Sequence, residues 1–293
     1  MNAARRMGLI AGWGHFPMEV ARALKRQGYE VYCLGIRDHA DPALADICDD
    51  FRLVGIAKVG GHVRYFRRNR VQLATMAGKI FKAKMLFRRF GWIGHLPDWR
   101  CCRAFYPHFL TGSMDRSDDT LLTTLVKTYA EDGIIFAPAT DFAPELLVNH
   151  GPLSVRGPTR AQMKDIRFGW RLAKELGRVD VGQTVVVKGL AAVALEAVEG
   201  TDECIRRAGT LCPRGGFTVV KVAKPQQDMR FDVPTIGLGT VKTLVEAGGR
   251  VLAVEAKKTI IVDEPRVLAF ARRHQLVLVA VSESDMVLKD QAA

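Results

Sequence analysis

The sequence lacks any apolar run of the length that a membrane span requires. Its 293 residues are 48% hydrophobic and 25% charged, but no stretch reaches the roughly 18 to 20 consecutive apolar residues of a transmembrane helix. The start, "MNAARRMGLIAG", is basic and then briefly apolar, and it lacks the longer apolar core of a signal peptide. We therefore expect a globular, cytoplasmic protein.

The six cysteines lack the spacing of a metal site or of a redox pair. No two of them form a C-x-x-C pair, and none has histidine partners at zinc spacing. We therefore expect reduced, structural thiols.

The sequence also lacks the Asn, Asp and His signatures of metallophosphoesterases and the glutamate helix of a Nudix enzyme. Any phosphate chemistry must then use another arrangement.

Acidic residues are nearly absent from one segment, which holds the positive charge of the chain. The formal net charge is +12, and from Arg52 to Arg103 there are thirteen lysines and arginines but one acid, Asp98. The rest of the chain is neutral, with 30 basic and 30 acidic residues. The basicity is a local feature, so it needs a local explanation.

Strands and helices alternate through the first half of the chain. The apolar patterns predict strands over 8–12, 29–36, 51–56, 71–78 and 133–138, and helices over 16–26 and 62–69. Ser117 is expected to cap a further helix, with Asp118 and Asp119 in its first turn as dipole partners or as ligands. This alternation predicts a Rossmann-like, doubly wound parallel sheet, assigned to a first domain of residues 1–153.

The second half is denser in strands. A Pro/Gly-rich break at 150–159 separates it from the first, and Thr159 is expected to cap a helix over 160–176. The apolar patterns that follow predict strands separated by short helices. The predicted strands are 184–189, 190–198, 217–222, 250–256, 259–262 and 276–281. We predict a second, strand-rich α/β domain of residues 154–293.

The turn after the first strand resembles part of a dinucleotide-binding fingerprint. In "GLIAGWGHFP", Gly12 and Gly14 fit the first two glycines, while Pro17 stands near the place of the third. Two functions stay open for this turn. It could hold a phosphate or nucleotide at a helix N-terminus, or it could serve a nicotinamide-dependent reductase in which Asp38 contacts the ribose.

Two stretches of the second half are unusually polar. One places Glu196, Glu199 and Asp202 directly after a strand, and the other packs charged residues from Lys221 to Asp232 before a Pro-Thr-Ile-Gly turn. Lysines balance phosphate charge, and carboxylates bind hard cations or orient an attacking water. The alternative is that these stretches are solvated turns and helix caps.

Four motifs together carry a family resemblance. They are "GLIAGWGHFP", the Asp-Asp and Leu-Leu pairs within 118–122, "GQTVVVKGLAAVALEAVEGTDE" at 182–203 and "AKPQQDMRFDVPTIG" at 223–237. The chain resembles UDP-2,3-diacylglucosamine pyrophosphatases of the LpxI type, enzymes of lipid A biosynthesis. The resemblance runs from Met7 to about Val281, and the last two motifs are the most specific.

The resemblance implies a function and a site. It implies two α/β domains with the substrate held between them, and a pyrophosphatase that needs a divalent metal, normally Mg²⁺. Such an enzyme splits UDP-2,3-diacylglucosamine into UMP and 2,3-diacylglucosamine 1-phosphate. The catalytic aspartate would be Asp232. From motif membership and chemistry we assign Asp232, Asp202 and Glu199 to the metal, and the following residues to the substrate: Gly12, Gly14, Pro17, Gln183, Lys224, Gln227 and Thr235.

The basic stretch "KIFKAKMLFRRF" at 79–90 departs from the family's pattern. Its apolar and basic residues separate at helical spacing, which suits an anionic membrane surface and a diacylated substrate. It could instead be a core-facing helix, a UDP contact or, without any motif to support it, a nucleic-acid site. We expect peripheral association with the cytoplasmic face of the inner membrane and no nucleic-acid partner, with homo-oligomerisation open. A non-catalytic nucleotide- or lipid-binding protein remains an alternative.

Overall fold

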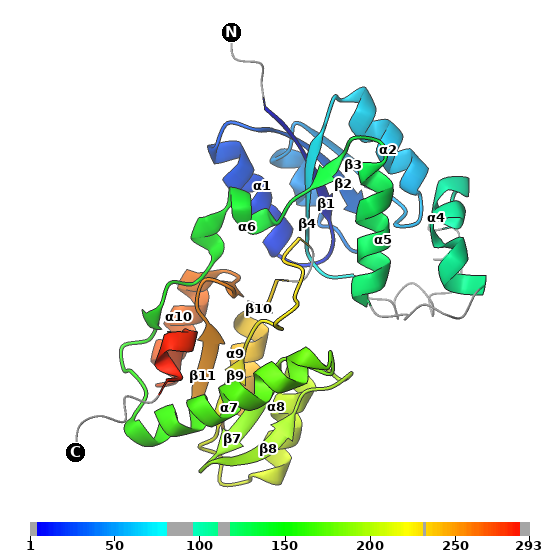
Figure 1. Ribbon diagram of the computed structural model, residues 1–293. Helices are drawn as coiled ribbons and strands as arrows, with labels where there is room; N and C mark the ends of the chain where they lie inside the picture. Colours follow the sequence, from blue (N-terminus) through cyan, green and yellow to red (C-terminus); the bar gives the residue numbers. More distant parts are fainter. Residues whose placement is uncertain (1–4, 81–95, 111–117, 231–232, 288–293) are drawn as a thin grey trace. The chain divides into compact units, whose positions relative to one another are not determined.

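The chain folds into two compact units, each with its own sheet. The computed structural model describes residues 5–80, 96–110, 118–230 and 233–287. One unit comprises Met1–Pro144 with Asp228–Phe231, and the other Glu145–Gln227 with Asp232–Ala293 (Figure 1). The expected two-domain α/β class is confirmed. The division precedes the predicted break at 150–159, because β6 (Gly151–Pro152) already pairs with β13 (Val277–Val281) in the second sheet.

The first unit is built on a parallel sheet. Its described strands are β1 (Arg6–Ala11), β2 (Glu30–Ile36), β3 (Asp50–Val54), β4 (Leu73–Ala77) and β5 (Ile135–Phe136). Their order is β3-β2-β1-β4-β5, with each neighbouring pair parallel. The chain thus winds outward from β1 in one direction and then resumes on the other side with β4. The switch point between β1 and β4 is where open α/β sheets commonly bind ligands.

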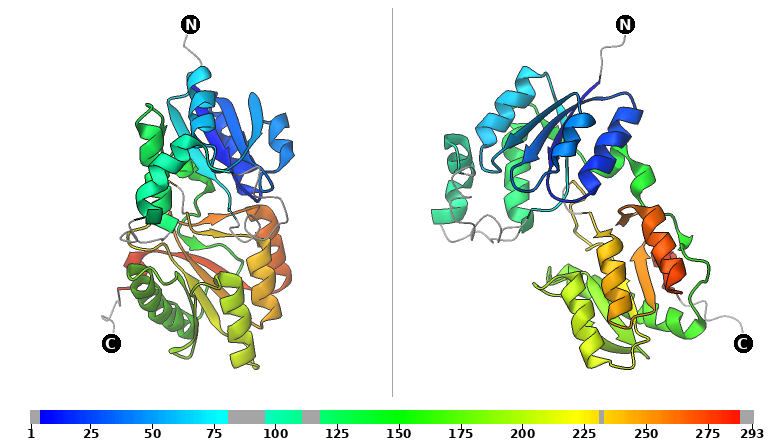
Figure 2. Two further views of the ribbon diagram at one scale, coloured as in Figure 1. Left: turned by 90° about the vertical axis from the view of Figure 1, so that its right-hand side faces the viewer. Right: turned by 180° about the vertical axis from the view of Figure 1, so that it is seen from behind.

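Helices cover both faces of this sheet. They are α1 (Phe16–Arg26), α2 (Val59–Arg68), α4 (Trp99–Leu110), α5 (Asp118–Ala130) and α6 (Ala139–Phe142). Figures 1 and 2 show α1 and α6 on one side, and α2 and α5 on the other. Phe66 of α2 and Tyr129 of α5 are fully buried against the sheet in one apolar cluster. This is the layered arrangement that alternating strands and helices predict.

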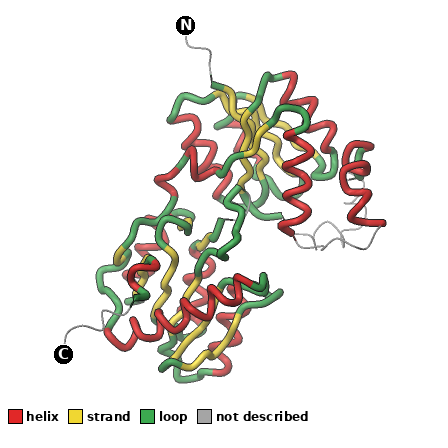
Figure 3. The backbone as a smooth tube through the Cα atoms, viewed as in Figure 1, coloured by secondary structure: helices red, strands yellow, loops and turns green. Residues whose placement is uncertain are grey.

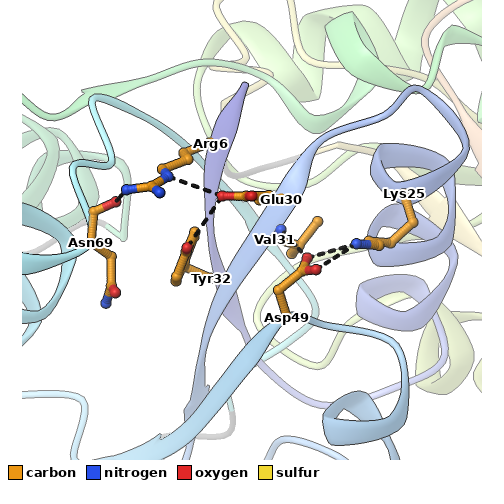
Figure 4. Close-up of polar contacts among 7 residues, drawn as sticks. All are labelled: Arg6, Lys25, Glu30, Val31, Tyr32, Asp49 and Asn69. Atoms are coloured by element: carbon orange, nitrogen blue, oxygen red, sulfur yellow. Dashed lines mark hydrogen bonds and ion pairs between the residues drawn. The ribbon is translucent and has the colours of Figure 1, made fainter. Parts of the chain in front are cut away.

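Ion pairs hold the amino-terminal edge of the first sheet (Figure 4). Arg6 pairs with Glu30 across β1 and β2 at 2.9 Å. The Asp49 carboxylate accepts from the Lys25 ammonium of α1 and from the Val31 N–H of β2, each at 2.7 Å. Burial alone would raise the pKa of Asp49, but these hydrogen bonds hold it below its usual range. This edge is therefore used for structural contacts.

The second sheet is mixed. Its further strands are β7 (Thr184–Lys188), β8 (Ala191–Leu195), β9 (Thr218–Lys221) and β11 (Val251–Glu255), in the order β6-β13-β11-β9-β7-β8. β9, β11 and β13 run parallel, whereas β6, β7 and β8 are each antiparallel to their neighbours. Two short strands, β10 (Thr235–Ile236) and β12 (Ile260–Ile261), form a separate parallel pair, visible as yellow segments in Figure 3.

Alternate residues of the second sheet face different helices. The helices are α7 (Arg160–Arg178), α8 (Thr201–Leu211), α9 (Leu238–Glu246) and α10 (Glu264–Arg273). Val220 packs in the cluster with α7, and its neighbour Val219 packs in the cluster with α8, α9 and α10, as the two-residue period of a strand requires. The predicted cap of α7 is confirmed, because Thr159 and Gln162 form a reciprocal capping box.

Candidate functional site

A buried lysine lies at the carboxyl end of β9. Lys221 is 6% exposed, and its ammonium donates to the Thr201 hydroxyl at 3.0 Å and to the Thr235 carbonyl at 3.1 Å. A buried ammonium is costly unless its donors are used in this way. Lys221 therefore connects the end of β9, the first turn of α8 and the start of β10.

A buried carboxylate completes this group from the opposite side. Glu196 is 7% exposed. Its Oε1 accepts from the Thr201 hydroxyl at 2.8 Å, and its Oε2 accepts from the Gln183 N–H at 3.2 Å. The Thr201 hydroxyl thus accepts from Lys221 and donates to Glu196, so it relays hydrogen bonding between two opposite charges. We refer to Glu196, Thr201, Lys221 and the Thr235 carbonyl as the β9 cluster.

Strand register explains why these residues meet. β7 is antiparallel to β9, and the register pairs Thr184 with Lys221. The hairpin to β8 then returns the chain, so the Glu196 N–H donates to the Thr184 carbonyl at 2.9 Å. Gly200 precedes α8 with a φ of +83°, which permits the turn that brings Thr201 to the helix start. Residues far apart in sequence are therefore fixed together.

The turn after β9 contains two of the predicted substrate residues. The Gln227 side chain accepts from the Lys224 N–H at 2.8 Å, and the Gln227 N–H donates to the Lys224 carbonyl at 3.1 Å. The Lys224 ammonium pairs with Asp180 at 2.6 Å. Gln227 thus closes the turn, and the cation predicted to face phosphate has a carboxylate beside it.

Two side-chain amides near β9 retain unused hydrogen-bonding capacity. The Gln183 Oε1 and the Gln227 Nε2 are buried atoms with no hydrogen-bond partner among the described residues. Buried polar atoms are nearly always paired, so each such atom calls for an explanation. A polar ligand is one explanation, and both residues belong to the substrate set that the sequence predicts.

A second charged pair, with a buried glutamate, lies at the carboxyl end of β11. Glu255 is 5% exposed, and its Oε2 accepts from the Lys174 ammonium at 2.6 Å and from the Ala223 N–H at 2.8 Å. The Lys174 ammonium also lies over the Trp170 ring, 5.0 Å from its centroid. Sequence reasoning missed this pair, although a glutamate that ends an otherwise apolar strand was a signal for it.

The predicted metal ligands are described only in part. Asp232 lies outside the described residues. The pKa of Glu199 lies below its usual value, first because of hydrogen bonding from its own backbone N–H and then because of Arg207. Arg207 contacts Glu199 Oε1 at 2.6 Å. Asp202 lies in the first turn of α8. The described residues contain no group of three acidic, histidine or cysteine side chains arranged for a metal.

The glycine turn of the first unit packs against the end of β4 and the residues that follow it. The Gly12 N–H donates to the Ala77 carbonyl and the Trp13 N–H to the Lys79 carbonyl, both at 2.8 Å. A Cβ on Gly78 would lie 2.8 Å from both Gly12 and the Pro17 ring. Two amides that could have faced a phosphate are therefore bonded within the fold. Gly14, with a φ of +108°, has open space beside it.

The structure brings some of the predicted residues together. Gln183 contacts the β9 cluster, Thr235 contributes its carbonyl to it, and Lys224 and Gln227 form the adjoining turn. The glycine turn belongs to the other unit. The basic stretch at 81–90 lies outside the described residues, as does the predicted cap at Ser117. All six cysteines carry free thiols.

Comparisons with known proteins match nearly the whole chain. Residues 6–146 match the model of the LpxI N-terminal domain, and residues 149–279 match that of the LpxI C-terminal domain. The UDP-2,3-diacylglucosamine pyrophosphatase LpxI of Caulobacter vibrioides is 29% identical over 279 residues, which cover 91% of this chain and 94% of that protein.

A solved structure gives a much weaker likeness. It is the biotin carboxylase domain dimer of the 2-oxoglutarate carboxylase of Hydrogenobacter thermophilus. The match covers 72% of this chain and 42% of that chain, at 11% identity and a TM-score of 0.27. The chain spans less than half of that protein's length, and a likeness at this level supports no conclusion.

Proposed function

The chain belongs to the LpxI family, and on that premise we propose that it hydrolyses the pyrophosphate bond of UDP-2,3-diacylglucosamine. The products would be UMP and 2,3-diacylglucosamine 1-phosphate, in lipid A biosynthesis. The observation that carries this proposal is the match along both units to family domains and to a relative of that name. The two buried amide atoms of Gln183 and Gln227 support a polar ligand near β9.

We assign the catalytic role to Asp232, through its place in the "D-x-P-T-I-G" motif. Its downstream neighbours are held firmly, because Lys221 donates to the Thr235 carbonyl and the Ile260 N–H donates to the Pro234 carbonyl at 2.8 Å. A carboxylate on such a frame could orient an attacking water. Gln183, Lys224, Gln227 and Thr235 are the proposed substrate contacts of the same unit.

We also propose that activity requires Mg²⁺. This cation prefers carboxylate oxygens and keeps several waters, and it would stabilise negative charge on the phosphates. Asp202 presents a carboxylate of this kind at the start of α8. Glu199 fits less well, since both of its oxygens accept hydrogen bonds, one from Arg207 and one from the Ala197 N–H. Asp202 and Asp232 are therefore the stronger proposed ligands.

A nicotinamide-dependent reductase has less support. The first sheet has a switch point between β1 and β4, where such a cofactor would bind, and Asp38 follows β2. However, Pro17 replaces the third glycine, and the Gly12 and Trp13 amides donate to the segment after β4. These features remove two contacts that a dinucleotide pyrophosphate would need.

We propose that the protein works at the cytoplasmic face of the inner membrane as a peripheral protein. A substrate with two acyl chains must be taken from a bilayer, and the basic stretch at 79–90 has the composition for contact with anionic lipid. Within the described residues, no helix is long and apolar enough to cross a membrane.

The direct test is release of UMP from UDP-2,3-diacylglucosamine in the presence of magnesium. We expect wild-type activity, loss of that activity with EDTA and recovery with added Mg²⁺. Asp232→Asn should lower kcat by roughly 10²- to 10⁴-fold, the range for a positioned acid or base. Asp263→Asn is the matched control, because it also removes a carboxylate and asparagine tolerates its φ of +55°.

Failure would take two forms. If wild-type protein released no UMP, the hydrolase assignment would be wrong. If Asp232→Asn retained full activity, the hydrolase assignment would survive and the catalytic assignment would fall.

A further inference from the structure

A pocket in the first unit has no place in the site described above. It has a volume of about 270 Å³ and lies where β2 and β3 end and α2 begins. We call it the β2–β3 pocket. Its lining includes Arg37, Arg52, Lys58, Gly61, His62 and Tyr65. The carboxyl ends of parallel strands are the usual place for ligands in such sheets.

The charge of the β2–β3 pocket is of one sign. Arg37, Arg52 and Lys58 line it, and none of the described residues that line it is acidic. Two of these cations, Arg52 and Lys58, come from the basic segment of the sequence. Arg52 pairs with the Asp50 carboxylate at 3.4 Å. Part of the unexplained charge of the chain is therefore gathered around one cavity.

The floor of the pocket is rigid and uncharged. His62 is 2% exposed, and its ring bonds to the Gly55 carbonyl at 2.9 Å and the Tyr129 hydroxyl at 2.7 Å. Burial lowers the pKa of His62 to about 4, so the ring is neutral near pH 7. The Arg52 guanidinium lies over the Tyr65 ring, 5.0 Å from its centroid. These contacts hold the walls in place.

One backbone amide that lines this pocket already has an acceptor. The Gly61 N–H in the first turn of α2 already donates to Asp98 at 3.1 Å. Anion binding would therefore depend on the guanidinium and ammonium groups, which make strong charge-assisted hydrogen bonds to phosphate oxygens. The volume is slightly below the range of pockets for drug-sized ligands, so it suits a phosphate with a small attached group and excludes acyl chains.

We propose that the β2–β3 pocket binds a phosphate group, held mainly by Arg37 and Lys58. The phosphate is carried by a nucleotide or by a phospholipid headgroup, two sources that share this chemistry. The inference does not depend on the hydrolase assignment, because it rests on the first unit alone. It also moves the expected anion contact of that unit from the glycine turn to the ends of β2 and β3.

The test compares two double variants of the full chain. Arg37→Ala with Lys58→Ala removes two pocket cations. Arg22→Ala with Arg68→Ala removes two exposed helix arginines and changes the net charge equally. UMP and inorganic phosphate are titrated into each protein by calorimetry. We expect the pocket variant to bind UMP at least about tenfold more weakly, since each charged hydrogen bond is substantial, and the control to stay within about twofold.

Several results would overturn the inference. Unchanged binding of UMP, of inorganic phosphate and of phosphatidylglycerol vesicles by the pocket variant would do so, as would equal weakening in both variants, which indicates general electrostatics. The inference would also fail if wild-type protein bound none of the phosphate probes. Arg37→Gln with Lys58→Gln, checked by circular dichroism, repeats the test with side chains of more similar length and separates lost binding from lost folding.

A third probe distinguishes the two sources of phosphate. Vesicles of phosphatidylglycerol are compared with vesicles of phosphatidylcholine for binding to each protein. A nucleotide site predicts that UMP binding falls in the pocket variant while vesicle binding does not. A headgroup site predicts the reverse. Either result supports phosphate recognition by Arg37 and Lys58. Both measurements are of binding and need no turnover, so their outcome is independent of the hydrolase assignment.

Discussion

The carboxyl edges of the two sheets carry charge in opposite ways. In the second sheet, Lys221 and Glu255 are buried and bonded to groups of the same unit. In the first, Arg37 and Arg52 are exposed around a cavity whose described lining has no acid. A buried charge must be compensated by its own fold, so it makes a rigid frame. An exposed cation keeps its water and can exchange it for a ligand.

The two edges also use different means to fix their loops. Charged side chains connect β9, α8 and β10 in the second unit. In the first, the turn at Gly12 is held by backbone hydrogen bonds to the exit of β4. Such a turn depends on close backbone approach, whereas the β9 cluster depends on charge. The following three variants test this difference, in decreasing order of expected effect.

Loss of the Lys221 ammonium should have the largest effect on stability. Lys221→Met leaves the Thr235 carbonyl without this donor and leaves Glu196 without the cation relayed through Thr201. We expect a loss of about 3–5 kcal/mol in the free energy of unfolding, the range for breaking a buried charged group's pairing. Urea denaturation measures it. Lys242→Met, at an exposed lysine of α9, should cost less than about 1 kcal/mol.

A Lys221→Met loss as small as that of Lys242→Met would show that the β9 cluster does not act as a charged frame. The two sheet edges would then differ in where their charges lie, and not in how much those charges contribute to the free energy of unfolding.

Acid should weaken the first unit through His62. Burial lowers the folded-state pKa of His62 from 6.5 to about 4. The unfolded chain then binds the proton more tightly, so stability is full above about pH 6.5 and falls as the pH drops toward 4. Two and a half pKa units correspond to about 3 kcal/mol. His62→Gln should lack this component when unfolding is compared at pH 7.5 and pH 4.5.

His274→Gln provides the comparison for that measurement, since His274 ends α10 in the other unit. If wild-type protein and His62→Gln lost stability in parallel between the two pH values, the neutral, buried state of His62 would be refuted.

Close backbone approach at Gly78 should give the smallest of the three effects. Gly78 has a φ of +94°, and an added Cβ would meet Gly12 and Pro17 at 2.8 Å. Gly133 also has a positive φ, +74°, but has open space around it. We expect Gly78→Ala to destabilise the protein by about 2 kcal/mol more than Gly133→Ala does, because only Gly78 adds overpacking. Thermal unfolding of both variants checks this, and equal melting temperatures would contradict it.

Strong local patterns were sufficient to predict much of the fold. The helix over 16–26 has the predicted bounds, and Thr159 caps α7 as expected. Helix α4 was not predicted, because its sequence "WRCCRAFYPHFL" contains Pro107, which usually ends a helix. The strand β10 was missed because it is only two residues long and follows Pro234.

The site was predicted less completely for a physical reason. Sequence placed Glu196 and Lys221 in polar stretches, but burial and pairing depend on the register of β7 against β9, which no local pattern specifies. The hydroxyl of Thr201 joins the two charges only once that register is set. The sequence showed the basic residues only as a segment along the chain. The sheet topology brings Arg37, which follows β2 and lies outside that segment, to the same pocket as Arg52 and Lys58.

The early strand β6 has a consequence for how the second half would behave alone. Pro152 pairs with Val279 at the border of the sheet, and proline offers no N–H to an incoming strand. The Leu153 N–H also donates to the Leu278 carbonyl at 2.9 Å. A polypeptide starting at residue 154 would leave the apolar strand β13 uncovered along its length. Such an edge recruits strands from other molecules, so that fragment should aggregate, while one starting at Glu145 should stay dispersed.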